Sequence, residues 1–270
     1  MYFFDSHAHI QRSTQWRTGR FRTMVQKATE VGLRAILVPA VSADDWGLVD
    51  DPPASEGLIV LIALGLHPYF VCEITLERSN SLLEELEFRV LGAGSKLHAI
   101  GECGLDFRRS GADQEVRDRQ ISTFRGQLEL ARRVGLPLTI HCVKAHAVMQ
   151  ELLLERPTPP SVMHAYSGSA EMARPLIAAG HYVSFAGNLC IANARKVIEA
   201  ARSVPRERLL IETDTPDQTP PGRGDVDNEP AFIVDIAARL AEVRGESLAE
   251  IAAATTDNAC RLFGVKALPP

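Results

Sequence analysis

The sequence predicts an α/β protein built as one (β/α)8 barrel of the TIM type, and three observations support this fold class. Short apolar runs alternate with longer amphipathic stretches, as parallel strands joined by helical crossovers require. Eight such runs can be counted, which is the strand number of this barrel. The chain has 270 residues, of which 46% are hydrophobic, and no linker divides residues 1–270 into two cores. We therefore expect a single domain.

Each predicted strand is a continuous apolar run, which is typical of strands buried on both faces. The runs cover residues 2–7, 34–40, 58–65, 97–102, 136–141, 161–165, 181–187 and 208–214. No GxGxxG sequence follows the first run, so a dinucleotide-binding open sheet is disfavoured.

Helical patterns lie between the strands and end at glycines, which adopt the left-handed cap readily. They include residues 23–32, 112–135 and 172–180. Two further amphipathic patterns, 230–245 and 247–264, close the chain, and Ser247 with Glu250 predicts a capping box at the second. We expect both closing helices to pack outside the barrel.

Charge and hydropathy limit the functional classes. The net charge of -5 excludes the broad basic surface of a protein that coats nucleic acid, but it allows a local site. No apolar run approaches the roughly 20 residues of a membrane span, and the start MYFFDSHAHIQR lacks the apolar stretch of a signal peptide. We expect a cytoplasmic protein without membrane association, and no obligate protein partner is evident.

Metal-binding residue types stand at the ends of six of the eight predicted strands. These residues are His7, His9, His67, Glu102, His141, His164 and Asp214. Strand ends converge on the C-terminal face of a barrel, where active sites of this architecture lie. A single histidine is more often structural, and this is how we interpret His98, His146 and His181, which lie at strand starts or within a helix. Repetition at equivalent strand ends favours a metal centre instead.

The number of ligand candidates indicates two ions rather than one. His7 and His9 are two residues apart, so both imidazoles point the same way along an extended strand. Four imidazoles and two carboxylates exceed the needs of one tetrahedral zinc with an open position, and they suit two divalent ions that share a carboxylate. Nitrogen and oxygen ligands without thiolate fit zinc, manganese or magnesium.

Short motifs along nearly the whole chain resemble the TatD-like metal-dependent hydrolases, deoxyribonucleases of the amidohydrolase superfamily. The motifs are DSHAH (5–9), GLHP (65–68), GECGLD (101–106), IH (140–141), HAYSG (164–168), SFAG (184–187), ETDTP (212–216), NEP (228–230) and NACRLFG (258–264). The resemblance implies a TIM-type barrel and hydrolysis of DNA phosphodiesters from the 3′ end at a divalent-metal centre. It also implies that His7, His9 and Asp214 hold one ion, that His141 and His164 hold the other, and that Glu102 bridges them.

Further residues receive roles around this predicted centre. Asp214 is expected to accept the proton of the attacking water, with Glu102 and His67 as the other catalytic groups. His67, Tyr166 and Lys144 are expected to contact substrate. Asp5 and Glu212 are candidates to orient ligating imidazoles. Gly104, Asp106 and Pro230 are expected to shape loops. Arg108 and Arg109, just after GECGLDF, would supply local positive charge for phosphates, although an exposed arginine pair is more often solvated surface.

The sequence departs from the family pattern at two places. After the fifth strand, HCVKAH puts Val143 and Lys144 where the family commonly has an arginine and an acidic residue. Lysine is a point charge and cannot form the bidentate fork of arginine on a phosphate. After Asp214 the loop reads DQTP, where an aromatic-Leu-Ala-Pro sequence is more frequent.

Three functional hypotheses follow from the sequence. The first is a 3′–5′ deoxyribonuclease that acts on single-stranded DNA or 3′ ends through a water activated by two metal ions. The second is a hydrolase that uses the same centre on a small amide, lactone or phosphoester, because a fold and ligand set fix the chemistry better than the substrate. The third is a non-catalytic scaffold, which the complete set of ligand positions disfavours.

Overall fold

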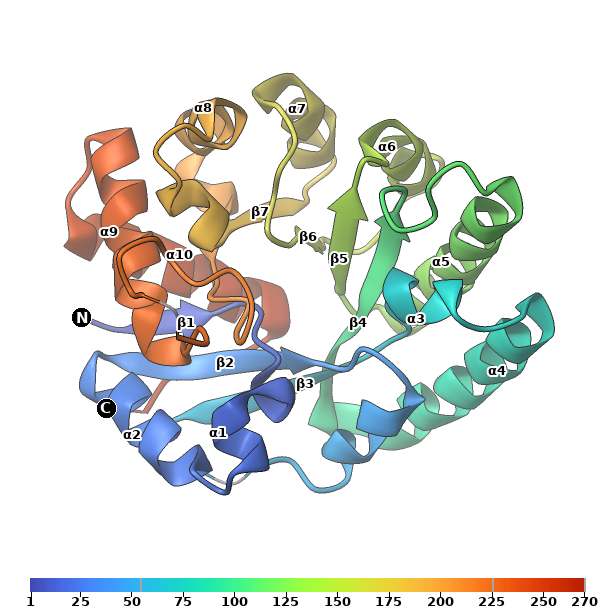
Figure 1. The fold of residues 1–270 in the computed structure, drawn as a ribbon, viewed down its shortest axis with the longest axis horizontal. Coiled ribbons are helices and arrows are strands. Elements are labelled where there is room, and N and C mark those ends of the chain that lie inside the picture. Colours follow the sequence, from blue (N-terminus) through green and yellow to red (C-terminus); the bar gives the residue numbers. More distant parts are fainter. Residues whose placement is uncertain (54, 225, 270) are drawn as a thin grey trace.

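Eight parallel strands pair in chain order and curve into a nearly closed barrel surrounded by helices (Figure 1). The computed structural model describes residues 1–53, 55–224 and 226–269. The strands are β1 (Phe3–Asp5), β2 (Leu33–Pro39), β3 (Ile59–Leu64), β4 (Leu97–Asp106), β5 (Leu138–Val143), β6 (Val162–Met163), β7 (Tyr182–Phe185) and β8 (Leu209–Ile211). The predicted (β/α)8 fold is confirmed.

The helices follow the predicted patterns and their caps. They are α1 (Thr14–Arg17), α2 (Phe21–Glu30), α3 (Pro68–Cys72), α4 (Leu76–Ala93), α5 (Gln114–Val134), α6 (His146–Leu154), α7 (Ala170–Ala178), α8 (Arg195–Ser203), α9 (Ile233–Arg244) and α10 (Leu248–Phe263). Gly135 ends α5 in the left-handed conformation, and Ser247 with Glu250 forms the predicted capping box of α10. Within the described residues, no helix combines the length and apolarity needed to cross a membrane.

The barrel wall is packed on both faces. Along β2, Ile36 and Val38 belong to the large cluster between sheet and helices, whereas Ala35 and Leu37 belong to a smaller cluster inside the barrel. This alternation explains why the strands read as unbroken apolar runs, because each face meets a different apolar layer.

Helix α10 covers the end of the barrel where the strands begin. Its Phe263 stacks on Phe4 of β1 with ring centroids 5.7 Å apart and joins the interior cluster. Asn258 on the same helix donates to the carbonyl of Leu209, the first residue of β8. The last helix thus packs against both the first and the last strand.

Side chains and backbone at the C-terminal ends of β1 and β8 close the barrel seam. The paired ladders run from β1 to β8, and the backbone N–H of Ser6 donates to the carbonyl of Ile211 at 3.1 Å. Farther along, the N–H of Asp214 donates to the carbonyl of His7 at 2.9 Å. The two segments that carry predicted ligands are therefore bonded directly to each other.

Candidate metal centre

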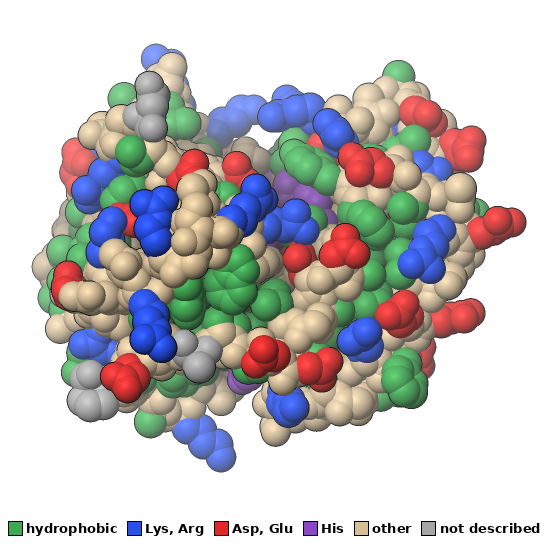
Figure 2. All heavy atoms as spheres, turned by 60° about the horizontal axis from the view of Figure 1, so that its bottom comes forward, with side chains coloured by type: hydrophobic (Ala, Val, Ile, Leu, Met, Phe, Trp, Pro, Cys, Tyr) green, Lys and Arg blue, Asp and Glu red, His purple; other side chains and the backbone are tan. Residues whose placement is uncertain are grey.

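The predicted ligands converge at the carboxyl ends of the strands, although several strands end elsewhere than expected. β1 stops at Asp5 and β8 at Ile211, so His7, His9 and Asp214 lie in the segments that follow. β4 is longer than predicted and continues to Asp106, which places Glu102 inside the strand. Figure 2 shows histidine side chains in a hollow of this surface, with Lys and Arg side chains beside them.

Two glycines allow Glu102 to reach the centre of the cluster. Gly65 follows β3, and a Cβ there would lie 2.5 Å from the Cα of Gly101. Gly101 itself has a φ of 141°, a conformation that side-chain-bearing residues rarely adopt. The backbone before Glu102 thus packs closely against its neighbour, and the carboxylate is only 1% exposed.

The two oxygens of Glu102 divide the histidines into two groups. Oε2 lies 2.9 Å from Nε2 of His9 and 3.2 Å from Nε2 of His7. Oε1 lies 2.9 Å from Nε2 of His164 and 3.0 Å from Nδ1 of His141. Oε1 is also 3.0 Å from Nε2 of His67. One carboxylate therefore faces both halves of the cluster, as a bridging ligand would.

Asp214 completes the half formed by His7 and His9. Its Oδ1 lies 3.9 Å from Nε2 of each histidine, and the three side chains form a group with metal-binding spacing. Its Oδ2 accepts a 2.6 Å hydrogen bond from Nε2 of Gln218. Gln218 belongs to the unusual DQTP loop, and its backbone passes so close to Gly187 that a Cβ there would overlap the Gln218 carbonyl.

The hydrogen bonds on the outer side of three histidine rings leave the inner nitrogens facing Glu102. Nδ1 of His9 meets the carbonyl of Pro39 at 3.1 Å, which can only accept. Nδ1 of His164 meets the Glu212 carboxylate at 3.2 Å, and Nε2 of His141 meets the Asp106 carboxylate at 3.0 Å. A neutral ring that donates outward carries its lone pair inward, which is the tautomer that binds a metal.

His7 fits the same arrangement, with Nδ1 placed 2.8 Å from the hydroxyl of Thr139. Its Nε2 lies 3.1 Å from Nε2 of His9, and Nδ1 of His141 lies 3.2 Å from Nε2 of His164. Two nitrogens that point lone pairs at each other repel unless a cation lies between or beside them. The donor set therefore suits divalent metal ions.

Electrostatics at the centre show the positive charge that the carboxylates attract: burial lowers the pKa of His9, His141 and His164, but the neighbouring carboxylates, above all Glu102, raise it above its usual value. Burial would raise the pKa of Glu102, but the imidazoles of His67, His164 and His7 hold that pKa well below its usual value. Burial raises the pKa of Asp214 to about 6, and it lowers the pKa of His7 to about 4. His7 is therefore neutral at pH 7 and able to ligate, and Asp214 gains from a neighbouring cation that keeps it ionised.

His67 has the opposite tautomer. Its Nδ1 accepts a 3.0 Å hydrogen bond from the backbone N–H of Tyr69, so in the neutral ring the proton is on Nε2. Burial lowers the pKa of His67 to about 4, so the ring is neutral. Although His67, Glu102 and His141 also have metal-binding spacing, His67 presents an N–H to the centre rather than a lone pair. This distinguishes it from the other four histidines.

Of three residues next to the cluster, two differ from expectation and one agrees with it. Asp5, expected to orient an imidazole, instead accepts from the backbone N–H of His7 and from the N–H and hydroxyl of Thr213. Asp106, expected only to shape a loop, contacts the ring of His141. Glu212 was expected beside a ligating imidazole, and it meets His164.

The predicted substrate-contacting residues occupy three different environments. His67 lies within the cluster. Lys144 is exposed on the segment after β5. Tyr166 is 2% exposed and its hydroxyl donates to the carbonyl of Ser169, so in this structure it supports the loop before α7 and offers no surface to a substrate.

Comparisons with known proteins agree with this arrangement. Residues 4–264 match the family described as TatD related DNase. The chain is 34% identical to YabD of Bacillus subtilis, described as an uncharacterized metal-dependent hydrolase, over 97% of this chain and 99% of YabD. It is 30% identical to the 3′-5′ ssDNA/RNA exonuclease TatD of Erwinia tasmaniensis, over 94% of this chain and 96% of that protein.

A solved structure supports the same relationship. The crystal structure of YjjV, a TatD homologue from Escherichia coli, superimposes with a TM-score of 0.83 at 30% identity and covers 97% of this chain and 98% of its own. The family match at residues 4–264 includes all the segments that carry the histidine and carboxylate cluster. The chain therefore belongs to the TatD-related DNase family and is a metal-dependent hydrolase.

Proposed function

We propose that this hydrolase is a 3′–5′ exodeoxyribonuclease that cleaves phosphodiester bonds at the ends of single-stranded DNA. The observation that carries the proposal is the carboxylate of Glu102, whose two oxygens face two separate sets of imidazoles. Centres with two ions stabilise both the attacking and the leaving oxygen of a displacement at phosphorus. The exonuclease name of the Erwinia relative favours a nucleic-acid substrate.

In this proposal two divalent ions, of zinc, magnesium or manganese, occupy the two halves of the cluster. His7, His9 and Asp214 would hold one ion, His141 and His164 would hold the other, and Glu102 would serve both. The outward hydrogen bonds of the imidazoles keep these rings in the ligating tautomer. When bound, the ions supply activation of the attacking water and polarisation of the phosphoryl oxygen.

The protein side chains supply proton transfer and orientation. Asp214 accepts the proton of the water at Oδ1, because its Oδ2 is occupied by the amide of Gln218. His67 would offer its Nε2–H, which in this structure lies 3.0 Å from Oε1 of Glu102, as a hydrogen-bond donor to a phosphate oxygen or to the leaving oxygen. Lys144, exposed beside the fifth strand, attracts the phosphate chain as a point charge.

Cleavage of labelled oligonucleotides tests the proposed function. We expect the purified protein to contain divalent metal and to shorten a 5′-labelled single strand progressively, while a 3′-labelled strand releases its label as a mononucleotide. A chelator should abolish both signals and added metal should restore them. Absence of DNA cleavage by metal-replete protein, with hydrolysis of a chromogenic ester, amide or lactone, would refute the nuclease and support the small-substrate hydrolase.

Thr139→Val tests whether the outer hydrogen bonds support metal binding. Valine keeps the shape of threonine but removes the hydroxyl that meets Nδ1 of His7. Loss of such a partner typically weakens metal binding about 10- to 100-fold, and we expect this in a competition titration against a chromophoric chelator. Thr255→Val, in which the lost hydroxyl bonded only within α10, is the matched control and should leave affinity unchanged. Equal affinities in the two variants would contradict the ligating role of His7.

A further inference from the structure

Tyr69 and Arg109 form an exposed aromatic and cationic pair at the edge of the metal centre, here called the stacking platform. The Tyr69 ring lies edge-on to the rings of His67 and His141, with centroids 4.7 and 5.6 Å apart. The guanidinium of Arg109 lies over the Tyr69 ring, 5.6 Å from its centroid. Tyr69 nevertheless remains 44% exposed. An accessible aromatic surface therefore lies directly against His141, one of the proposed metal ligands.

Both members of the stacking platform are fixed relative to the cluster. Tyr69 lies in the first turn of α3, where its N–H donates to Nδ1 of His67. The N–H of Arg109 donates to Oδ1 of Asp106 at 2.8 Å, and the other oxygen of that carboxylate meets His141. Tyr69 is thus bonded directly to a histidine of the centre, and Arg109 is bonded to a carboxylate that contacts another.

The chemistry of the platform matches a flat, electron-rich ligand next to a phosphate. Aromatic side chains stack on nucleobases without selecting one base, and an arginine guanidinium adds a cation–π contribution. In a nucleotide one sugar ring separates the base from the phosphate. In the protein one imidazole, that of His141, separates Glu102 from the Tyr69 ring, so a phosphate at the centre would leave its base near the platform. Glu73, 3.4 Å from Arg109, orients the guanidinium while both side chains remain exposed.

We propose that Tyr69 and Arg109 form a nucleobase-binding subsite that stacks on the base adjoining the cleaved phosphodiester. This inference rests on the proposed nuclease function and names the part of the substrate that the rim of the site recognises. Neither residue touches the reacting atoms, so the platform contributes to binding and end positioning. A small ester without a base would gain nothing from it.

Steady-state kinetics on single-stranded DNA test the subsite. Removal of a stacking side chain typically weakens binding by about 1–3 kcal/mol per base, or roughly 5- to 150-fold. We expect Tyr69→Ala to raise KM for an oligonucleotide within this range while kcat changes by less than about twofold, which is the pattern for loss of uniform binding. Tyr69→Phe should retain the wild-type KM, since it keeps the ring.

Abasic substrates separate stacking from a structural role. A strand with a tetrahydrofuran residue at the 3′-terminal or penultimate position should raise the wild-type KM as much as Tyr69→Ala does. Combining that substrate with Tyr69→Ala should then raise KM no further, because both changes remove one contact. Equal losses on intact and abasic strands, or a fall in kcat alone, would show that Tyr69 only supports His67, and would overturn the inference.

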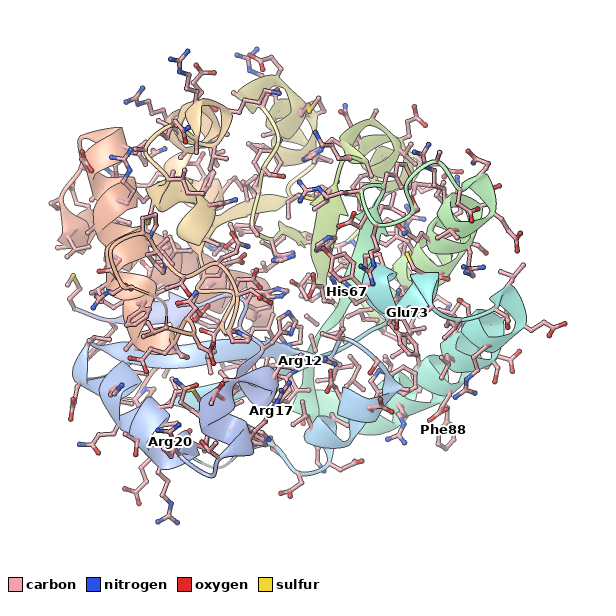
Figure 3. All side chains as sticks on the ribbon, in the orientation of Figure 1. Arg12, Arg17, Arg20, His67, Glu73 and Phe88 are labelled. Atoms are coloured by element: carbon pink, nitrogen blue, oxygen red, sulfur yellow. The ribbon has the colours of Figure 1, made fainter. Side chains whose placement is uncertain are left out.

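A binding experiment keeps this inference separate from the nuclease proposal. Chelator-treated protein is titrated with a single strand that carries 2-aminopurine at its 3′ end, whose fluorescence falls on stacking. Wild-type protein and Phe88→Ala should quench equally, because Phe88 is 79% exposed on α4 at the outer edge of the molecule (Figure 3). Tyr69→Ala should not quench. If chelator-treated wild-type protein quenches but metal-replete protein does not cleave, the nuclease is rejected and the subsite is kept. If the metal-replete protein cleaves but Tyr69→Ala quenches as the wild type does, the subsite alone is rejected.

Discussion

Glu102→Gln is expected to lower the rate of hydrolysis about a thousandfold or more and to reduce the bound metal. A bridging carboxylate supports both ions, and metal catalysis contributes several kcal/mol at about 1.36 kcal/mol per tenfold in rate. Glutamine keeps the size of the side chain but removes the charge that lies within 3.2 Å of His7. It also replaces one carboxylate oxygen by an N–H₂ group, which cannot bind a metal ion.

The measurement is metal content by elemental analysis together with kcat/KM on the substrate that the wild type cleaves. Circular dichroism and a thermal melt of the metal-free proteins show whether the fold survives. Glu246→Gln is the matched control. Glu246 is also largely buried, but it follows α9 and pairs with Arg244, the last residue of that helix. If Glu102→Gln retained full metal content and rate, the carboxylate would have no bridging role.

Asp214→Asn is expected to lower kcat by about 10²- to 10⁴-fold, the range for loss of a positioned general base. The amide oxygen of asparagine can still accept from Gln218, so the position of the side chain is preserved. What disappears is the negative charge and the proton acceptor beside His7 and His9. We expect weaker binding of one metal ion and a loss of kcat that added metal does not restore.

Pre-steady-state cleavage and metal titration distinguish these two effects. Asp217→Asn is the control. The Asp217 side chain is exposed, and the hydrogen bonds that this residue makes around the loop come from its backbone. It should behave like the wild type. Full recovery of Asp214→Asn at saturating metal would mean that Asp214 serves as a ligand and another group takes the proton.

The barrel and most of the cluster could be predicted because each rests on a local pattern. Apolar runs identify strands that are buried on both faces, and His7, Glu102, His141 and Asp214 stand near the ends of such runs. A barrel brings those ends together whatever their separation in the chain. The convergence therefore follows from strand order and needs no knowledge of exact boundaries.

The residues that hydrogen-bond the ligand histidines from outside, Asp106 and Thr139, were not predicted. Their positions depend on strand length and register, which the apolar pattern does not fix. Asp106 is four residues after Glu102, and in an extended strand the two side chains share a face. Ending β4 at 102 hid this relation, because Gly104 and Asp106 read as a loop. Thr139, two residues before His141 in β5, also shares a face with a ligand, and this signal was available in the sequence.

Other features had no local signal. Gln218 reaches Asp214 because the loop folds back against Gly187, a contact between distant segments. The burial of Tyr166 depends on the turn that brings its hydroxyl to Ser169. The tautomer of His67 is set by the N–H of Tyr69, which becomes available only because α3 begins directly after His67.

The seam between β1 and β8 has a consequence for biosynthesis. His7 is translated before nearly all of the barrel and Asp214 after its last strand, yet their backbones are bonded to each other. A nascent chain that has not emerged beyond the eighth strand lacks one wall of the hydrolytic pocket, and α10 has not yet sealed the opposite end. The metal centre is therefore complete only once the eighth strand and the segment that carries Asp214 have been translated.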